Sequence, residues 1–92
     1  MNTEEDGWRG FLKICSKCQS LREFDRIMNL FLTHQERNVV ATRFLILREL
    51  IRGKKTQREM AKDLKVSIAK ITRGSNFLKT IKPDPRRLFE DS

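Results

Sequence analysis

The sequence predicts an all-α protein with six helices, and three observations lead to this prediction. Apolar residues recur at intervals of three and four along most of the chain, which is the spacing of one helix face. Three Ser/Thr-x-x-Glu motifs mark helix starts, and no segment shows the alternation typical of a β-strand. With 92 residues, the chain has the length of one small domain.

The first helix is expected from Trp8 to about Gln19. The residues before it are acidic and end at Gly7, so we expect a disordered start and no secretory signal. The residues that give this helix its apolar spacing are Trp8, Phe11, Leu12, Ile14, Cys15 and Cys18.

Cys15 and Cys18 form a lone C-x-x-C, and His34 is the only histidine. A zinc site would need two more ligands, so we expect the thiols to be packed and no metal to be bound. An enzyme or redox protein that uses the two cysteines is a rival function. No nucleophile–base pair, acidic cluster or phosphate loop supports it, and we expect no enzyme activity.

Two capping motifs open the next helices. Ser20 can cap the second helix, with Glu23 at the capping-box position, and Thr33 with Glu36 opens the longest helix, about 34–52. That helix carries apolar residues around most of its circumference: Val39, Val40, Ala41, Phe44, Leu45, Ile46, Leu47, Leu50 and Ile51. A chain of this size cannot cover such a helix on all sides, so a second subunit is the natural cover. We therefore expect an obligate homodimer.

Residues 56–73 have the pattern of a helix-turn-helix. Thr56 with Glu59 forms a third capping box, and Gly53 ends the preceding helix. Lys65 and Val66 form the turn. The expected inward residues are Met60, Ala61 and Leu64 on the first helix, and Ile68, Ile71 and either Phe77 or Leu78 on the second; Ser67 caps this second helix.

The C-terminal segment is expected to form a last short helix. Pro83 and Pro85 stop the preceding helix, and Asp84 can cap a new one that returns Leu88 and Phe89 to the core. The expected organisation is one helical domain over 1–92, with a dimerisation core at 8–52, the helix-turn-helix at 53–80 and the short helix at 83–91.

The charge pattern favours a polyanionic partner. The net charge is +8 and the pI about 10.1, and residues 34–92 hold fifteen Lys/Arg against seven Asp/Glu. Between residues 52 and 73 the ratio is eight to two, so the excess is greatest over the helix-turn-helix, as nucleic-acid binding requires. No apolar run approaches the roughly 20 residues that span a bilayer. We expect a cytoplasmic DNA-binding protein with no membrane partner.

The candidate DNA contacts differ in kind. Ile68 and Ala69 at the start of the second helix are expected to face the major groove. Gln57 and Arg58 can contact a phosphate or a base edge, and Lys70 and Thr72 are expected at phosphates. The remaining candidates are Lys54 and Lys55, which attract phosphate loosely from a solvated loop, and Ser67.

Several motifs together resemble the tryptophan repressor family. The resemblance runs without a gap from about Trp8 to Lys79, and ITRGSN is its most specific part. The motifs are LxLT at 30–33, ER at 36–37, TR at 42–43, RG at 52–53, QRE at 57–59 and ITRGSNxLK at 71–79.

The resemblance implies an intertwined homodimer that binds a palindromic operator and represses transcription when L-tryptophan, its corepressor, is bound. Arg43 and Arg73 would hold the indole between their guanidinium planes, and Gly74 would leave room for the ligand. The polar end of the ligand would be bound by Thr33 and the carbonyls of Leu30 and Leu32 of the partner subunit. Without the resemblance, both arginines could be ordinary surface cations.

Three departures from the family pattern bear on function. Phe77 stands where the motif can carry a serine that reaches the ligand ammonium, which makes the pocket more apolar. Lys70 replaces a small polar residue and adds a phosphate contact, and the turn lacks the family's usual glycines, which predicts a stiffer DNA-reading head. The alternative function is a helix-turn-helix DNA-binding dimer that is ligand-independent or answers a different ligand.

Overall fold

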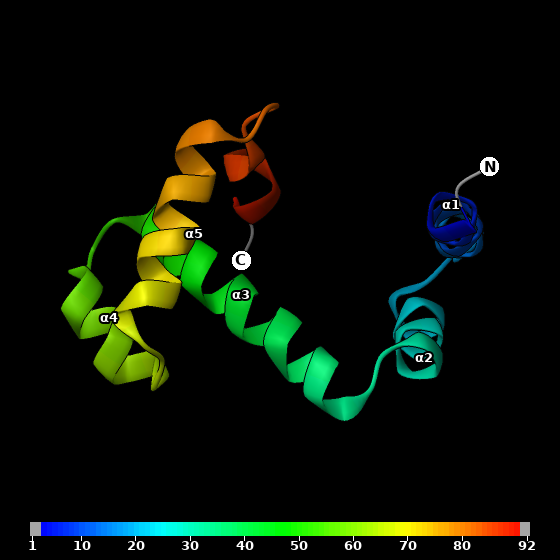
Figure 1. Ribbon diagram of the computed structural model, residues 1–92, viewed down its shortest axis with the longest axis horizontal. Helices are drawn as coiled ribbons and strands as arrows, with labels where there is room; N and C mark the ends of the chain where they lie inside the picture. The colour runs from blue at the N-terminus through cyan, green and yellow to red at the C-terminus, as the bar shows by residue number, and fades with distance from the viewer. Residues whose placement is uncertain (1–2, 91–92) are drawn as a thin grey trace. The chain divides into compact units, whose positions relative to one another are not determined.

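The computed structural model describes residues 3–90, which form five α-helices and one 3-10 helix joined by short connections (Figure 1). The elements are α1 (Thr3–Ser16), α2 (Leu21–Phe31), α3 (His34–Arg52), α4 (Gln57–Leu64), α5 (Ile68–Thr80) and η1 (Pro85–Phe89). The all-α class is confirmed, but the expected sixth α-helix is wrong. The last element has five residues, begins at a proline and is a 3-10 helix, a form usual for such short segments. The predicted range 83–91 also extends one residue beyond the described part.

The chain divides into two compact units, Met1–Arg37 and Asn38–Ser92. The first unit holds α1, α2 and the first turn of α3. The second holds the rest of α3 together with α4, α5 and η1. The residues expected to read DNA therefore all belong to the second unit.

Helix α1 begins earlier and ends earlier than predicted. It starts at Thr3, inside the stretch that we expected to be disordered, because its first turn carries three acidic residues at the positive end of the helix dipole. It ends at Ser16 in a tight turn, where the Cys18 N–H donates to the Cys15 carbonyl at 3.1 Å. The predicted helix 8–19 was therefore wrong at both ends, and Cys18 lies outside the helix.

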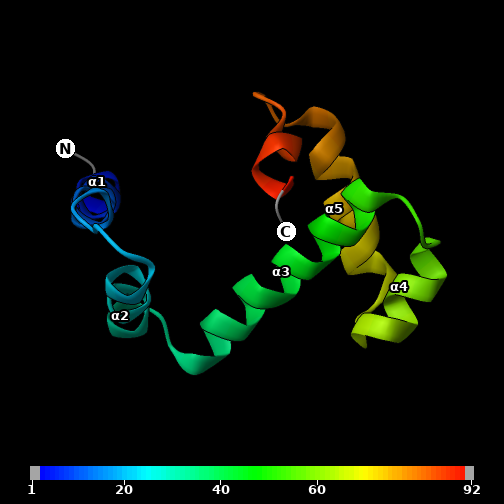
Figure 2. The same cartoon turned by 180° about the vertical axis from the view of Figure 1, so that it is seen from behind.

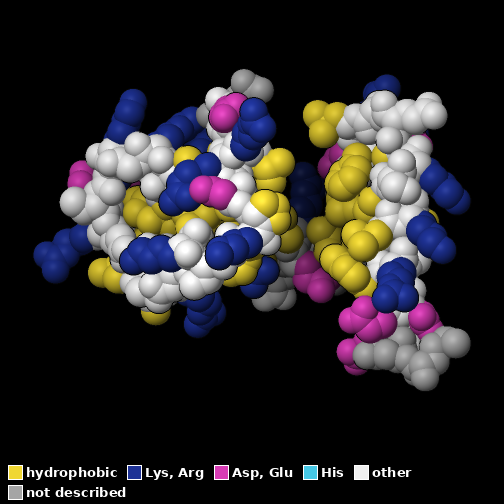
Figure 3. Space-filling model, turned by 90° about the horizontal axis from the view of Figure 1, so that it is seen from above, with side chains coloured by type: hydrophobic (Ala, Val, Ile, Leu, Met, Phe, Trp, Pro, Cys, Tyr) yellow, Lys and Arg dark blue, Asp and Glu magenta, His cyan; other side chains and the backbone are white. Residues whose placement is uncertain are grey.

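Aromatic contacts join α1 to α2 within the first unit. The Trp8 and Phe11 rings are stacked with centroids 5.5 Å apart, and Phe11 meets Phe31 edge-on at 5.0 Å. Neither helix buries any of its described residues. Hydrophobic side chains gather on one face of this unit (Figure 3).

Ser20 and Thr33, two of the predicted capping residues, both cap helices. Ser20 accepts a hydrogen bond from the Glu23 N–H at 3.1 Å, although the Glu23 carboxylate bonds the Gln19 N–H and not that of Ser20. Thr33 and Glu36 form the reciprocal pair at the start of α3, at 2.9 and 3.1 Å. Gly53 ends α3 as predicted, and it does so in the left-handed conformation with φ of 67°.

The core of the second unit lies where α3, α4 and α5 meet (Figure 1 and Figure 2). Ile46, Met60 and Ile71 are at most 4% exposed. Packed around them are the half-buried side chains of Leu50, Ala61, Leu64 and Val66. Each of the three helices thus contributes one fully enclosed side chain to a single cluster.

On the inward face of α5, one expectation is confirmed and another needs correction. Of the two candidates at its end, Leu78 is buried and Phe77 is 51% exposed, since successive residues point about 100° apart around a helix. Ile68, also expected to be inward, is 47% exposed in the first turn of α5. Ile68 therefore lies on the surface, which leaves it available to an outside partner.

The C-terminal segment returns to α3 through one aromatic contact. Asp84 caps η1 as predicted, accepting the Arg86 N–H at 3.0 Å, and Pro85 is its first residue. The Phe89 ring stacks on Phe44 with centroids 5.5 Å apart. Leu88, which was expected to join it, is 82% exposed.

Candidate nucleic-acid and ligand site

A three-residue connection joins α4 to α5 at the predicted turn. Lys65 adopts the left-handed conformation with φ of 56°, and the Val66 N–H donates to the Ala61 carbonyl at 3.1 Å. The Ser67 hydroxyl then accepts the Lys70 N–H at 3.3 Å and starts α5. Ser67 is thereby occupied as a cap, and the turn is closed without glycine.

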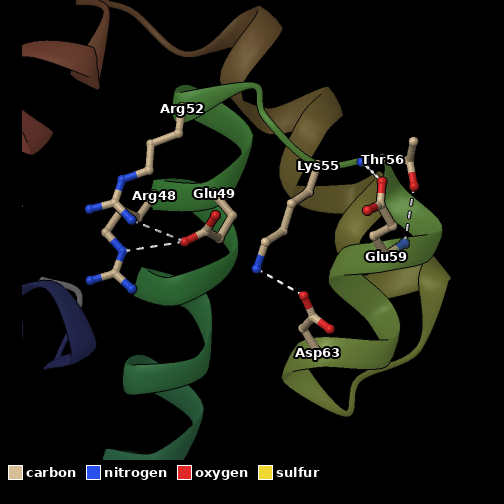
Figure 4. A network of polar contacts seen from close by, with 7 residues as sticks. All are labelled: Arg48, Glu49, Arg52, Lys55, Thr56, Glu59 and Asp63. Atoms are coloured by element: carbon tan, nitrogen blue, oxygen red, sulfur yellow. Dashed lines mark hydrogen bonds and ion pairs between the residues drawn. The ribbon is translucent and has the colours of Figure 1, made fainter.

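The start of α4 is fixed by the capping box of Thr56 and Glu59 (Figure 4). The Thr56 N–H donates to the Glu59 carboxylate at 3.0 Å, and the Glu59 N–H donates to the Thr56 hydroxyl at 3.1 Å. The backbone hydrogen bond from Thr56 is the main cause that lowers the pKa of Glu59. This carboxylate therefore stays charged and engaged at neutral pH.

An ion pair ties the loop before α4 to the end of that helix. The Lys55 ammonium lies 2.8 Å from the Asp63 carboxylate (Figure 4). Their hydrogen bond and mutual attraction raise the pKa of Lys55 and lower that of Asp63. Of the two loop lysines expected to attract phosphate, Lys55 is therefore already engaged within the protein, while Lys54 is exposed.

A side-chain hydrogen bond joins α4 to α5. The Thr72 hydroxyl donates to the Gln57 side-chain oxygen at 3.1 Å, across 15 residues of sequence. Gln57 is half-buried at the first position of α4, and Thr72 is exposed on α5. Two residues that were each expected to contact DNA are thus partners of one another.

All four carboxylates between residues 49 and 84 are already engaged. Glu49 lies 3.3 Å from Arg52 and 3.7 Å from Arg48 (Figure 4). The other three serve as caps or pair with a cation. Arg58, Lys70 and Arg73 are exposed and have no hydrogen-bond or ion-pair partner among residues 3–90. Lys and Arg side chains project from this unit in Figure 3. The excess positive charge of this unit is therefore exposed to solvent.

The start of α5 has the surface that a major-groove contact needs. Ile68, Ala69 and Lys70 occupy its first turn and are all exposed. Their combination of methyl groups and one ammonium suits thymine methyl contact and phosphate attraction. Arg58 on α4 is exposed as well.

The residues proposed to bind a ligand belong to both units. Arg43 on α3 and Arg73 on α5 are exposed in the second unit, without partners among the described residues. Leu30, Leu32 and Thr33 lie in the first, and the Thr33 hydroxyl accepts the Glu36 N–H at 3.1 Å. The two groups lie in different units, and their assembly into one pocket stays a prediction.

Comparison with known proteins decides the family. The model of the family described as Trp repressor protein matches residues 6–92. The chain belongs to this family. It is 50% identical over 89 residues to the Trp operon repressor homolog of Chlamydia trachomatis serovar D, covering 97% of this chain and 95% of that one. It is also 38% identical over 77 residues to that of Haemophilus influenzae strain PittEE, covering 84% of this chain and 76% of that one.

In this member of the Trp repressor family, the space beside Gly74 is filled from α3. A β-carbon there would meet Ile46, Leu50 and Leu47 at 3.1, 3.4 and 3.8 Å. A side chain at position 74 would therefore force Ile46 to shift by a few tenths of an ångström for α5 to keep its close packing on α3. The expected role of Gly74 in making room for a ligand stays a prediction.

The family resemblance gave no indication of two polar contacts around α4. Lys55 and Asp63 are eight residues apart, and Gln57 and Thr72 fifteen, so no helical or strand spacing links either pair. Both contacts depend on how the loop and helices pack in three dimensions. The charge types alone were the only signal for the first pair, and the second had none.

The cysteines are free and half-buried. Burial, with smaller contributions from Glu23 and Cys15, raises the pKa of the Cys18 thiol, which disfavours the nucleophilic thiolate. Within residues 3–90 no three His, Cys, Asp or Glu side chains are grouped as a metal site. Over the same residues, no helix has both the length and the apolar character of a membrane span.

Proposed function

We propose that the chain is an L-tryptophan-responsive, sequence-specific DNA-binding repressor of tryptophan-metabolism genes. The observation that carries the proposal is the first turn of α5, which presents Ile68, Ala69 and Lys70 to solvent beside exposed cations without partners. Membership of the Trp repressor family supports it. The function is regulatory and not catalytic, and as a repressor the protein would act on DNA in the cytoplasm.

The apolar surface of a single chain supports the proposal of a homodimer. Trp8, Val40 and Phe44 are 58, 53 and 40% exposed, and Leu21 and Leu30 are exposed even more. Apolar surface on this scale marks an interface in a water-soluble protein. A two-fold dimer would present two α5 helices to successive major grooves, roughly 34–36 Å apart, and so would bind a palindromic operator.

L-tryptophan is the proposed corepressor, bound by Arg43 and Arg73 with Gly74 close by. Thr33, Leu30 and Leu32 of the partner subunit would bind its polar end. Two exposed guanidinium groups without protein partners suit a ligand with an aromatic ring and a carboxylate. The ligand acts by binding the DNA-competent arrangement more tightly than the other, and the shift is limited by that difference.

The alternative is a DNA-binding dimer that is ligand-independent or answers another ligand. Phe77 favours it, because a 51% exposed apolar ring stands one turn after Arg73, where the family motif can carry a serine. A mobility-shift titration with and without L-tryptophan separates the two functions. Equal affinity under both conditions supports the alternative.

Calorimetric titration with L-tryptophan tests the ligand site directly. Arg73→Ala should abolish the binding heat, whereas the matched variant Lys79→Ala, an exposed cation on the same helix, should retain it. Loss of binding in both variants would indicate a general charge effect, and retention in both would remove Arg73 from the site.

DNA binding by the wild type should weaken steeply as salt is raised, because its cations displace counterions from phosphates.

A further inference from the structure

The hydrogen bond between Thr72 and Gln57 fixes the direction of an amide. Thr72 Oγ1 donates to Gln57 Oε1 at 3.1 Å, so the oxygen end of the amide faces α5. An amide carries its oxygen and its NH2 group on opposite sides of the side-chain axis. The NH2 group therefore points away from Thr72, and no residue within 3–90 accepts a hydrogen bond from it.

Gln57 also occupies a position that favours an electron-rich partner. It is the first residue of α4, at the positive end of the helix dipole, and it adjoins Arg58, an exposed cation without a protein partner. An acceptor atom with partial or full negative charge is favoured there. The free NH2 group supplies the matching donor.

We propose that Thr72 is a positioning residue that holds Gln57 with its NH2 group outward, so that Gln57 donates a hydrogen bond to an acceptor atom of the DNA. The inference rests on the proposed DNA binding and specifies one contact within it. The acceptor is a phosphate oxygen or the N7 or O6 atom of a guanine. Thr72, whose proton is already donated to Gln57, is not itself the phosphate donor.

This arrangement disfavours one familiar mode of base recognition. Glutamine reads adenine by accepting from N6 and donating to N7 at once, which needs the oxygen and the nitrogen on the same outer edge. In this protein the oxygen is turned toward α5. Gln57 therefore acts as a donor alone.

The test begins with a duplex selected by the wild-type protein, with L-tryptophan present, from a randomised DNA library. Affinity for this duplex is then measured for Thr72→Val, Thr72→Ser, Gln57→Ala and the Thr72→Val/Gln57→Ala double variant. Thr72→Val should lose about threefold to tenfold, the effect of one hydrogen bond, and Thr72→Ser should restore it. In the Gln57→Ala background, Thr72→Val should change affinity by less than about twofold, because the amide that it positions is gone.

Two outcomes would overturn the inference. One is a Thr72→Val variant that binds as the wild type does, and the other is an equal loss from Thr72→Val with and without Gln57. Circular dichroism and thermal unfolding show whether the variants are folded. If Thr72→Val does not fold, Gln57→Glu takes its place, because its carboxylate can still accept from Thr72 but has no NH2 group. A loss of DNA affinity under twofold in Gln57→Glu would overturn the inference.

Altered DNA identifies the acceptor. Neutral methylphosphonates remove a charged phosphate oxygen, and 7-deazaguanine removes the N7 atom of guanine. The atom that Gln57 contacts is the one whose removal lowers the DNA affinity of the wild type but not that of Gln57→Ala. If replacing an adenine by purine, which lacks N6, produces that pattern instead, Gln57 is accepting and the inference is wrong.

If the wild type enriches no duplex from the library, the proposed function fails. If it enriches one and Thr72→Val does not change the affinity, only this inference fails.

Discussion

A β-carbon on Gly74 would lie 3.1 Å from Cγ2 of Ile46, closer than side chains normally approach. Ile46 is 4% exposed and belongs to the core shared by α3, α4 and α5, so it has little room to move. The glycine thus sets how closely α5, the proposed recognition helix, lies against α3. Arg43 and Arg73 are carried on these same two helices, so the separation of their backbones depends on this contact.

Gly74→Ala should therefore destabilise the protein by about 1 kcal/mol. Overpacking costs about 1–3 kcal/mol, and the better helix propensity of alanine offsets about 0.5–1 kcal/mol. Gly10→Ala is the matched control, since Gly10 lies in α1 with nothing within 4 Å of its β-carbon position. It should gain about 0.5–1 kcal/mol. Urea unfolding measures the free energy of unfolding of both variants. Equal gains in stability would show that the Ile46 side chain moves aside at little cost.

Lys65→Gly should stabilise the protein by about 0.5 kcal/mol. Lys65 has a φ of 56°, which costs a residue with a side chain about 1–2 kcal/mol. Glycine removes this cost but loses more entropy on folding. Lys65→Ala keeps the strain and should show no gain. If both variants gain equally, the lost charge and not the backbone is responsible.

The connection between α4 and α5 should stay ordered without ligand. Four interactions within the protein hold this connection and need no ligand: the Thr56–Glu59 box, the Ser67 cap, the Lys55–Asp63 pair and the Thr72–Gln57 bond. Backbone amides of α4 and α5 should show equal hydrogen-exchange protection with and without L-tryptophan. A large rise in protection on adding the ligand would contradict this expectation.

Phe89→Ala should release η1 from α3. Its ring stacks on Phe44 at 5.5 Å, and Arg48 lies 5.5 Å from the same Phe44 ring. The lost aromatic contact should cost about 1 kcal/mol, visible as a lower melting temperature. Leu88→Ala, at a position that is 82% exposed, should change stability by less than about 0.5 kcal/mol. Similar losses in both would indicate a general role of the segment.

The free energy of unfolding should fall at acidic pH and stay constant near neutral pH. Hydrogen bonds or ion pairs lower the pKa of Glu36, Glu59, Asp63 and Asp84. Since each folded pKa lies below its unfolded value of about 3.9–4.3, the stabilisation is complete above that value and is lost as pH falls through the folded pKa. The urea midpoint should be flat from about pH 8 to 5 and decline below about pH 4. Glu59→Gln should reduce the decline, and a midpoint that rises in acid would contradict the assignment.

The helix starts could be predicted from the sequence because their causes are local. Thr33, Thr56 and Ser67 each bond a backbone group three residues away, and their motifs show this directly. The acidic first turn of α1 is just as local, but it lacks an apolar pattern and was misjudged as disorder. The choice between Phe77 and Leu78 depended on the phase of α5 against α3, which spacing alone does not set.

The residue types of the candidate site could be predicted from the sequence, but the side-chain bonds between them could not. Exposure of Ile68, Ala69, Lys70 and Arg73 fits the roles expected of them. Lys55 and Thr72 were expected at phosphates, whereas each is bonded to a residue far along the chain, Asp63 and Gln57. Such pairings depend on tertiary packing and leave no periodic trace in the sequence.

The engaged carboxylates of the second unit have a physiological consequence. Residues 38–92 contain no histidine or cysteine, and the pKa values of Asp63 and Lys55 are displaced away from neutrality. The pKa values of Glu59 and Asp84 in this unit are lowered as well, and so they also move away from neutrality. The proposed affinity for DNA should therefore depend closely on ionic strength and hardly on pH. We expect the proposed DNA-reading head to respond to osmotic stress, which changes ionic strength, and not to acid stress.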